Sequence, residues 1–356
     1  MKSPACGCPL AGDAFTARII TVTMSGLPAG PRPTLPLATV YQFRPFVNSD
    51  PPRLAEIWRS QPPQRGLMQP VSAMLLEQFV FSKPYFDRAG LIVATRDGRP
   101  IGFAHAGFGP SDDGSAVSTE MGTTYLLMLH ADARDDAVAD ELLARSEAYL
   151  RDRGAKLIYG GGIRPLNAFY LGLYGGSELP GVLATDLVFG EACRRNGYRP
   201  IDRVMILRRD LSEYRPPITR EQRQLRRTVA SGETYCPPPT SWWETCTTGA
   251  FEQIDFYVQR LESNELLASV SFWDVEPLST SWGVATAGMF DLQVTSEARR
   301  KGLATFLMGE AFNRLRNRGI VVVEAQTMHG NAPALAMYQK LGFETVDHGD
   351  VFRKGD

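Results

Sequence analysis

An internal repeat constrains the fold of this 356-residue chain more than any other feature of its sequence. The run Leu150-Arg151-Asp152-Arg153-Gly154 recurs as Leu315-Arg316-Asn317-Arg318-Gly319, 165 residues further along. Two more pairs match at the same offset: Arg134 with Arg299, and Leu142 with Leu307. Chance explains one such match but hardly this many in one register. The sequence therefore indicates two tandem copies of one domain.

Strand-like and helix-like segments alternate in both copies, which is typical of a mixed α/β fold. In the second copy, Leu303–Arg318 predicts a helix that Gly319 ends, and Ile320–Ala325 predicts a strand buried on both faces. The other strands expected in this copy are Phe251–Leu261, Leu266–Trp273 and Gly288–Val294. In the first copy we expect strands at 40–46, 90–95, 100–108, 125–129 and 157–159, and helices at 53–60 and 137–153. Residues 219–251 show no clear strand and helix pair.

Proline content suggests the domain limits. Residues 1–38 hold six prolines and no periodicity, which predicts a disordered leader that a start at Met24 would largely remove. Pro216 and Pro217 mark a linker within Ser212–Thr219. We therefore expect one domain over 39–211 and a second over 220–356.

Charge and cysteine usage narrow the class of protein. Lys plus Arg number 38 against 39 for Asp plus Glu, so no overall basic field attracts nucleic acid or an anionic membrane. The five cysteines form no C-x-x-C pair, which argues against a disulfide framework or a zinc site. No apolar run of 18 residues and no signal-peptide pattern occurs. We expect a monomer in the cytoplasm, without a metal and without nucleic-acid or membrane partners.

The strongest functional signal is the run Arg299-Arg300-Lys301-Gly302-Leu303-Ala304, which follows the expected strand residues Leu292-Gln293-Val294 and opens a helix. Amides at a helix N-terminus are unpaired and lie at the positive end of the helix dipole, so they suit a pyrophosphate. Gly302 lets the backbone approach such a ligand closely. The alternative is a solvated helix start, but three basic residues there oppose the dipole, which a bound polyanion explains better.

A second motif, Asn331–Phe343, begins about 30 residues later. Asn331 can cap a helix, Pro333 fits its first turn and Gly342 ends it. Tyr338 lies seven residues beyond Asn331 and so falls on the same helix face. Taken alone, Tyr338 would be a core aromatic residue with a polar tip.

Together, the pattern R-x-x-G-x-A after a strand and the pattern N-x-x-A-x-x-x-Y-x-x-x-G-F resemble the GNAT superfamily of acetyltransferases. The resemblance covers Gly288–Phe343 and continues more weakly back to Phe251. Two such domains in one chain resemble the tandem arrangement of the mycothiol synthases. The resemblance implies that each domain has a central, mostly antiparallel sheet flanked by helices, with one splayed pair of strands.

The resemblance also implies a reaction. Acetyl-CoA would be the co-substrate, a backbone amide near Val294 would polarise its thioester carbonyl, and Tyr338 would protonate the leaving thiolate. A primary amine, on a small molecule or a protein N-terminus, would attack directly in a ternary complex. The residues expected to bind the cofactor are Leu292, Gln293, Val294, Arg299, Arg300, Lys301, Gly302, Leu303, Ala304, Asn331 and Tyr338.

The base that deprotonates the amine stays open among Asp291, Glu324 and His329. Asp291 reaches the face of Gln293 only if a bulge interrupts the strand. Glu324 lies near a strand end where an acceptor would enter, but it can equally be a solvated charge there. His329, in a loop, has a suitable ordinary pKa of about 6.5 but can be incidental.

The first copy lacks the functional pattern. Arg134-Asp135-Asp136-Ala137-Val138-Ala139 stands where the second copy has its basic loop, and Cys193 stands four residues before Gly197, where a tyrosine would be expected. Two acids oppose anion binding, so we predict that this copy is degenerate. It also holds about 20 extra residues within Gly160–Thr185, either a lid or acceptor-binding loop, or a structural loop at the domain interface.

Two other functions keep the same fold. One is an acyltransferase that uses another acyl group. The other is a non-catalytic acyl-CoA-binding or regulatory protein, which the first copy already resembles. The second copy retains both the basic loop and Tyr338, which favours catalysis.

Overall fold

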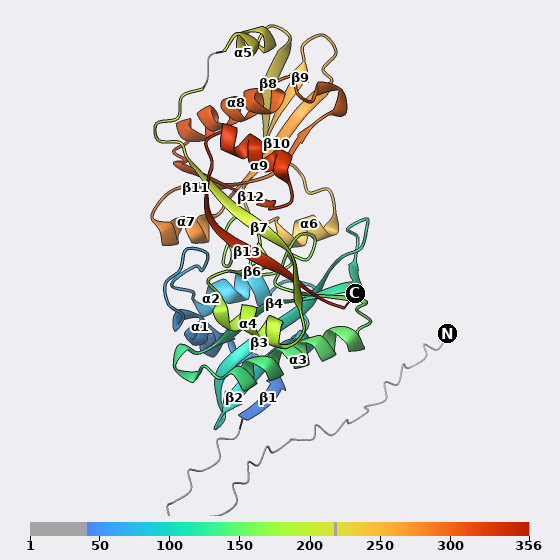
Figure 1. Cartoon of the computed structure of the whole chain (residues 1–356), viewed down its shortest axis with the longest axis vertical. Helices are drawn as coiled ribbons and strands as arrows, with labels where there is room; N and C mark the ends of the chain where they lie inside the picture. Colours follow the sequence, from blue (N-terminus) through green and yellow to red (C-terminus); the bar gives the residue numbers. More distant parts are fainter. Residues whose placement is uncertain (1–40, 217–218, 356) are drawn as a thin grey trace, which may run out of the picture.

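The computed structural model describes residues 41–216 and 219–355, so the expected leader at 1–38 lies outside the described residues. One continuous 13-stranded sheet runs along the molecule, with helices packed on both halves (Figure 1). This is the mixed α/β architecture that the sequence predicts.

The first copy forms the lower half in Figure 1. Its strands are β1 (Tyr41–Pro45), β2 (Leu91–Arg96), β3 (Arg99–Pro110), β4 (Val117–Leu129), β5 (Leu157–Gly160), β6 (Val182–Leu183) and β7 (Arg199–Asp210). Its helices are α1 (Pro51–Arg59), α2 (Ala73–Leu76), α3 (Asp136–Asp152) and α4 (Leu187–Arg195). Short helical turns occupy Glu77–Phe81, Arg88–Gly90 and Ala131–Ala133. The expected strands and helices are confirmed, but β4 is eight residues longer at its start than predicted, because its polar first half shows no apolar pattern.

The second copy forms the upper half. Its strands are β8 (Val229–Tyr235), β9 (Gln253–Arg260), β10 (Leu266–Asp274), β11 (Thr286–Val294), β12 (Val322–Met328) and β13 (Glu344–Lys354). Its helices are α5 (Arg220–Leu225), α6 (Trp242–Thr247), α7 (Glu276–Trp282), α8 (Leu303–Asn317) and α9 (Ala332–Lys340), with a short turn at Ser296–Ala298. The stretch that the sequence left unassigned holds α5, β8 and α6.

Strand pairing reproduces the repeat. In the first copy β4 runs parallel to β5, with Met121 opposite Leu157 and Thr124 opposite Gly160. In the second copy β11 runs parallel to β12, with Thr286 opposite Val322 and Met289 opposite Ala325. All four positions differ by the same 165 residues, so the two copies share one backbone register as well as one sequence pattern.

The last strands of the two copies are exchanged. The sheet order is β1-β2-β3-β4-β5-β13-β7-β12-β11-β10-β9-β8. The final strand of the second copy, β13, therefore pairs with β5 of the first, and β7 of the first pairs with β12 of the second. β7 and β13 also pair with each other, side by side at the centre of Figure 1. Each half of the sheet thus needs a strand from the other copy.

Helices cover the sheet through apolar faces. In the second copy Leu303, Leu307, Ala311 and Leu315 of α8 are all buried in one core, as their four-residue spacing predicts. In the first copy α3 and α4 cover one face of the sheet, while α1 and α2 pack on the other.

The extra segment of the first copy is built into its core. Tyr170 and Tyr174 are buried among residues of α1 and β4, and Tyr170 stacks on Trp58 with ring centroids 5.9 Å apart. These two tyrosines therefore belong to the core and do not line a mobile lid.

Candidate active site

The parallel strands β11 and β12 separate at one end. Their pairing stops at Met289 and Ala325, while β11 continues along β10 and β12 continues along β7. A bulge interrupts β11 at this point, because Ser269 faces Gln293 but Ser271 faces Phe290, and Asp291 takes a positive φ of 50°. The bulge that the role of Asp291 required is therefore present.

Beyond the bulge, the Val294 amide faces the side that β12 has left. Thr295 N donates to Leu267 O at 3.0 Å, which makes Ala268 and Val294 a non-hydrogen-bonded pair. The Val294 N–H and C=O therefore both point away from β10. The carbonyl oxygen accepts a 3.1 Å bond from Arg299 Nε.

The basic loop leads into α8 through an unusual backbone. Arg300 has φ of 60°, and Gly302, the residue before α8, has φ of 78°, a conformation that glycine adopts freely. Within the described residues no side chain caps α8, and its first intrahelical bond runs from Phe306 N to Gly302 O at 3.0 Å. The amides of this first turn therefore lack intrahelical partners, and the exposed residues Arg299–Gly302 surround them with positive charge.

Helix α9 begins and ends as predicted. The Asn331 side chain accepts a 3.3 Å bond from Ala334 N, which caps the helix. Tyr338 is 7% exposed, and its ring packs edge-on against Phe343 with centroids 5.2 Å apart. Burial, and secondarily the negative charge of Glu178, raise the pKa of Tyr338, so its phenol keeps its proton at neutral pH.

Glu324 is fully buried, so it is not the solvated charge that one interpretation of the sequence allowed. Its carboxylate forms an ion pair with Arg65 and accepts a 2.7 Å bond from Ser177 N, both from the first copy. Both carboxylate oxygens are thus engaged in joining the two copies.

Asp291 and His329 lie nearer to solvent. Asp291 forms a 2.6 Å ion pair with Arg164 of the first copy, and both side chains are nearly half exposed. His329 is exposed at the end of β12, where its backbone N–H donates to Arg203 O at 2.7 Å. Among the described residues its ring makes no hydrogen bond, so the structure does not join it to the other candidates.

Glu178 lies in the extra segment that the sequence allows to be a lid or an acceptor-binding loop, but the sequence assigns it no catalytic role. Burial raises its pKa to about 7, Arg164 opposes the shift and Asp291 adds to it. Its backbone oxygen accepts a 2.8 Å bond from the Gln326 side chain, on β12 just beyond the last pairing with β11. The glycine-rich composition of Gly160–Thr185 was the only sequence signal, because nothing local to Glu178 indicates which strands it approaches.

The first copy closes its corresponding helix start with its own acid. The Asp135 carboxylate accepts a 2.9 Å bond from Ala137 N at the start of α3, and a 3.0 Å bond from the Tyr41 hydroxyl. Cys193 is completely buried in α4, where it packs in the core of that half. The residues that would hold an anion or donate a proton are thus replaced by a cap and a core side chain.

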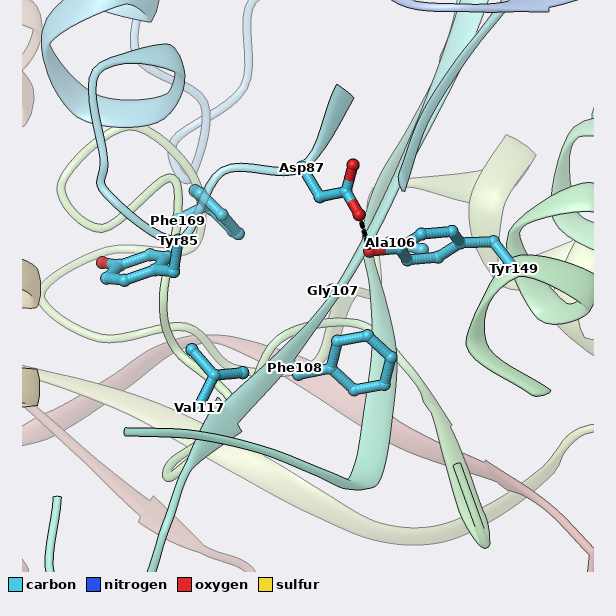
Figure 2. Close-up of a pocket in the computed structure, with 8 residues that line it drawn as sticks. All are labelled: Tyr85, Asp87, Ala106, Gly107, Phe108, Val117, Tyr149 and Phe169. Atoms are coloured by element: carbon cyan, nitrogen blue, oxygen red, sulfur yellow. Dashed lines mark hydrogen bonds between the residues drawn. The ribbon is translucent and has the colours of Figure 1, made fainter. Parts of the chain in front are cut away.

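A small cavity also lies in the first copy, away from the second copy's loop. Figure 2 shows it beside β3, with the Tyr149 hydroxyl 3.0 Å from the Asp87 carboxylate. Its volume of about 20 Å³ is enough for one water molecule and too small for a cofactor.

Neither a metal-binding cluster nor a membrane-spanning helix occurs among the residues that the structure describes. No three His, Cys, Asp or Glu side chains are grouped closely enough to hold a metal ion. No helix within 41–216 and 219–355 is long and apolar enough to cross a membrane.

Part of the chain is similar in sequence to known acetyltransferases. Residues 228–343 match the model of the acetyltransferase (GNAT) family. A mycothiol acetyltransferase of Cellulomonas flavigena is 31% identical over 98 residues, which is 27% of this chain and 27% of that protein. A ribosomal protein bS18-alanine N-acetyltransferase of Salmonella typhimurium is 33% identical over 57 residues, which is 16% of this chain and 38% of that protein. The matched parts span well under half the length of either relative.

A solved structure shares the whole architecture. A tandem GNAT protein from the clavulanic acid biosynthesis pathway aligns with a TM-score of 0.58 and 15% identity, over 88% of this chain and 98% of that chain. The likeness confirms the predicted tandem fold.

Proposed function

Because residues 228–343 belong to the acetyltransferase (GNAT) family, we propose that the chain is an acetyl-CoA-dependent N-acetyltransferase. It moves the acetyl group to a primary amine by direct attack in a ternary complex. The single observation that carries the proposal is the uncapped start of α8, with its positive φ at Gly302 and its exposed basic residues.

The loop Arg299–Ala304 binds the pyrophosphate of coenzyme A through its amides, and its basic side chains add charge around the diphosphate. Asn331, which caps α9, and Tyr338, within α9, line another side of the same site. The residues Leu292–Val294 lie along the pantetheine arm, where β11 leaves β12.

The thioester reacts beside Val294. The Val294 amide donates a hydrogen bond to the carbonyl oxygen and stabilises the negative charge that develops on it. The neutral amine attacks the carbonyl carbon, the C–S bond breaks and Tyr338 protonates the thiolate. The raised pKa of Tyr338 keeps its proton available for this step.

The acceptor is a primary amine of a small molecule or of a protein N-terminus. The names of the two relatives cover both possibilities, since one is a mycothiol acetyltransferase and the other acetylates an alanine of a ribosomal protein. The alternative of a protein that only binds acyl-CoA predicts binding without thiol release. The alternative of another acyl group predicts thiol release from a longer acyl-CoA and not from acetyl-CoA.

Calorimetry with coenzyme A tests the central claim. Wild-type protein should bind with one site per chain, and reversing Arg299, Arg300 and Lys301 to Glu should abolish measurable binding. Thiol release from acetyl-CoA with a panel of amines then separates a transferase from a binding protein. Absence of heat with the wild type, or unchanged affinity after charge reversal, would refute the proposal.

A further inference from the structure

The extra segment of the first copy is fixed against the strands of the second. Ser177 N donates to Glu324, and the Gln326 side chain donates to the backbone oxygen of Glu178 at 2.8 Å. The contact is also tight sterically, because a Cβ added to Gly288 of β11 would lie 2.5 Å from the Ser177 Cβ. Two consecutive positions, Ser177 and Glu178, are thus held by β11 and β12.

This anchoring puts Glu178 where the two strands separate. Gln326, which holds it, directly follows Ala325, the last residue of β12 that pairs with β11. Tyr338 of α9 is near enough for the negative charge of Glu178 to add, after burial, to the rise in the pKa of its phenol. Glu178 and Tyr338 come from different copies but influence the same small region.

The carboxyl group of Glu178 is the acid there that has no partner. Within the described residues it forms no hydrogen bond and no ion pair, although the residue is only partly exposed. Asp291 is paired with Arg164, and Glu324 is paired with Arg65. An unpaired, largely enclosed carboxyl group beside a reaction centre is poised to exchange a proton.

We propose that Glu178, supplied by the first copy, is the catalytic base for the acceptor amine bound to the second copy. This inference rests on the proposed acetyltransferase function. The ammonium N–H bond breaks and the proton passes to the Glu178 carboxylate, which leaves a neutral amine. The amine nitrogen then bonds to the acyl carbon as the C–S bond breaks, and Tyr338 protonates the departing sulfur.

Two protons leave the nitrogen in all. Glu178 accepts the first and passes it to water. The second replaces the proton that Tyr338 gave to the sulfur. The surroundings of Glu178 adjust its pKa for this role. Burial raises the pKa to about 7, Arg164 opposes the shift and Asp291 adds to it. A base with a pKa near the working pH combines a large ionised fraction with useful basicity.

The test replaces Glu178 in the full chain. Glu178→Gln should lower kcat/KM for the best amine of the panel by about 100-fold or more, the contribution typical of a general base. Its affinity for coenzyme A, measured by calorimetry, should stay at the wild-type value. Glu262→Gln, the same substitution in the exposed turn after β9, should leave both quantities unchanged.

The pH dependence of kcat/KM separates a catalytic base from a structural residue. The wild-type rate should rise with pH through about 7, and Glu178→Gln should lose this rise while Glu178→Asp keeps part of it. Arg164→Gln should move the rise to higher pH, and Asp291→Asn should move it to lower pH. These opposite shifts follow from the opposite effects of the two charges on Glu178.

The outcomes distinguish this inference from the proposed function. If the wild type releases thiol and Glu178→Gln keeps its rate and pH profile, only the role of Glu178 is overturned. If the wild type binds no coenzyme A, or releases no thiol with any amine, both proposals fall.

Discussion

The two copies begin their equivalent helices in opposite ways. In the first copy the Asp135 carboxylate bonds to Ala137 N and closes the start of α3. In the second copy Arg300 stands at the matching position, and no side chain in the part of the chain that the structure describes caps α8. One self-supplied carboxylate is enough to occupy amides that would otherwise receive a phosphate. The comparison shows how the same helix start can be closed or left open while the fold around it is retained.

The largest expected effect is the loss of folding when β13 is removed, which tests whether the two copies can fold independently. Ending the chain at Phe343 removes β13, which pairs with β5, β6 and β7. Both halves should then lose cooperative unfolding, because a central strand of one continuous sheet is missing. Circular dichroism during heating measures this. Removing only the residues after Lys354 is the control, and independent folding of residues 39–211 would contradict the expectation.

The next effect concerns the two helix starts. Gly302→Glu should weaken coenzyme A binding by about 100-fold, or roughly 3 kcal/mol, because it adds a carboxylate and strains a backbone with φ of 78°. Ala137→Glu, at the matching place in the first copy, should leave binding unchanged. Lys301→Glu tests charge without that backbone strain and should weaken binding by about 10-fold. Equal effects at both helix starts would mean that the first copy still binds the cofactor.

Tyr338 and Cys193 stand at corresponding positions of the two copies, and only the replacement of Tyr338 is expected to change the reaction rate. Tyr338→Phe should lower kcat by about 100-fold and leave coenzyme A affinity nearly unchanged, because only the proton donor is removed. Cys193→Ala should keep full activity and lower the free energy of unfolding by about 1 kcal/mol, because it removes a buried core atom. Steady-state kinetics and chemical denaturation measure the two quantities.

A smaller effect is expected from the cap itself. Asp135→Ala should lower the free energy of unfolding by about 1 kcal/mol, the usual contribution of a helix cap. Arg300→Ala should leave stability unchanged and weaken coenzyme A binding. Denaturant titration and calorimetry give the two readings. A second coenzyme A site appearing in Asp135→Ala would show that the acid alone had closed the first copy.

A further expected effect is a pH dependence of stability from Glu178. Its pKa is about 7 in the folded chain against an ordinary value of 4.5. Between these values the unfolded chain has already lost the proton that the folded chain keeps, so the free energy of unfolding falls as pH rises. Glu178→Gln should remove this fall and melt at a higher temperature than the wild type at pH 8. A parallel pH dependence in both proteins would contradict the shift.

Local signals explain what the sequence could predict. The apolar spacing of α8, its start at Gly302 and the cap at Asn331 all depend on residues close together in the chain, and each is found as expected. The start of β4 was missed because Val117–Met121 is mostly exposed and polar. A strand of that kind is held by its neighbours and not by burial.

Long-range placement explains what the sequence could not predict. Nothing in β13 indicates that it pairs with β5, since an alternating pattern specifies a buried face and not a partner. Glu178 and Tyr338 are far apart in the chain, and only the docking of the first copy on Gln326 relates them. The role expected for Glu324 depended in the same way on Arg65, which lies in the other copy.

The exchange of final strands makes each copy depend structurally on the other. A chain without residues 1–211 would have an unpaired β12 edge. Its β13 would also lack both of its neighbouring strands, β5 and β7. Such a product would tend to self-associate through those open edges. The second copy therefore depends on the first to complete its sheet, whatever the first copy itself binds.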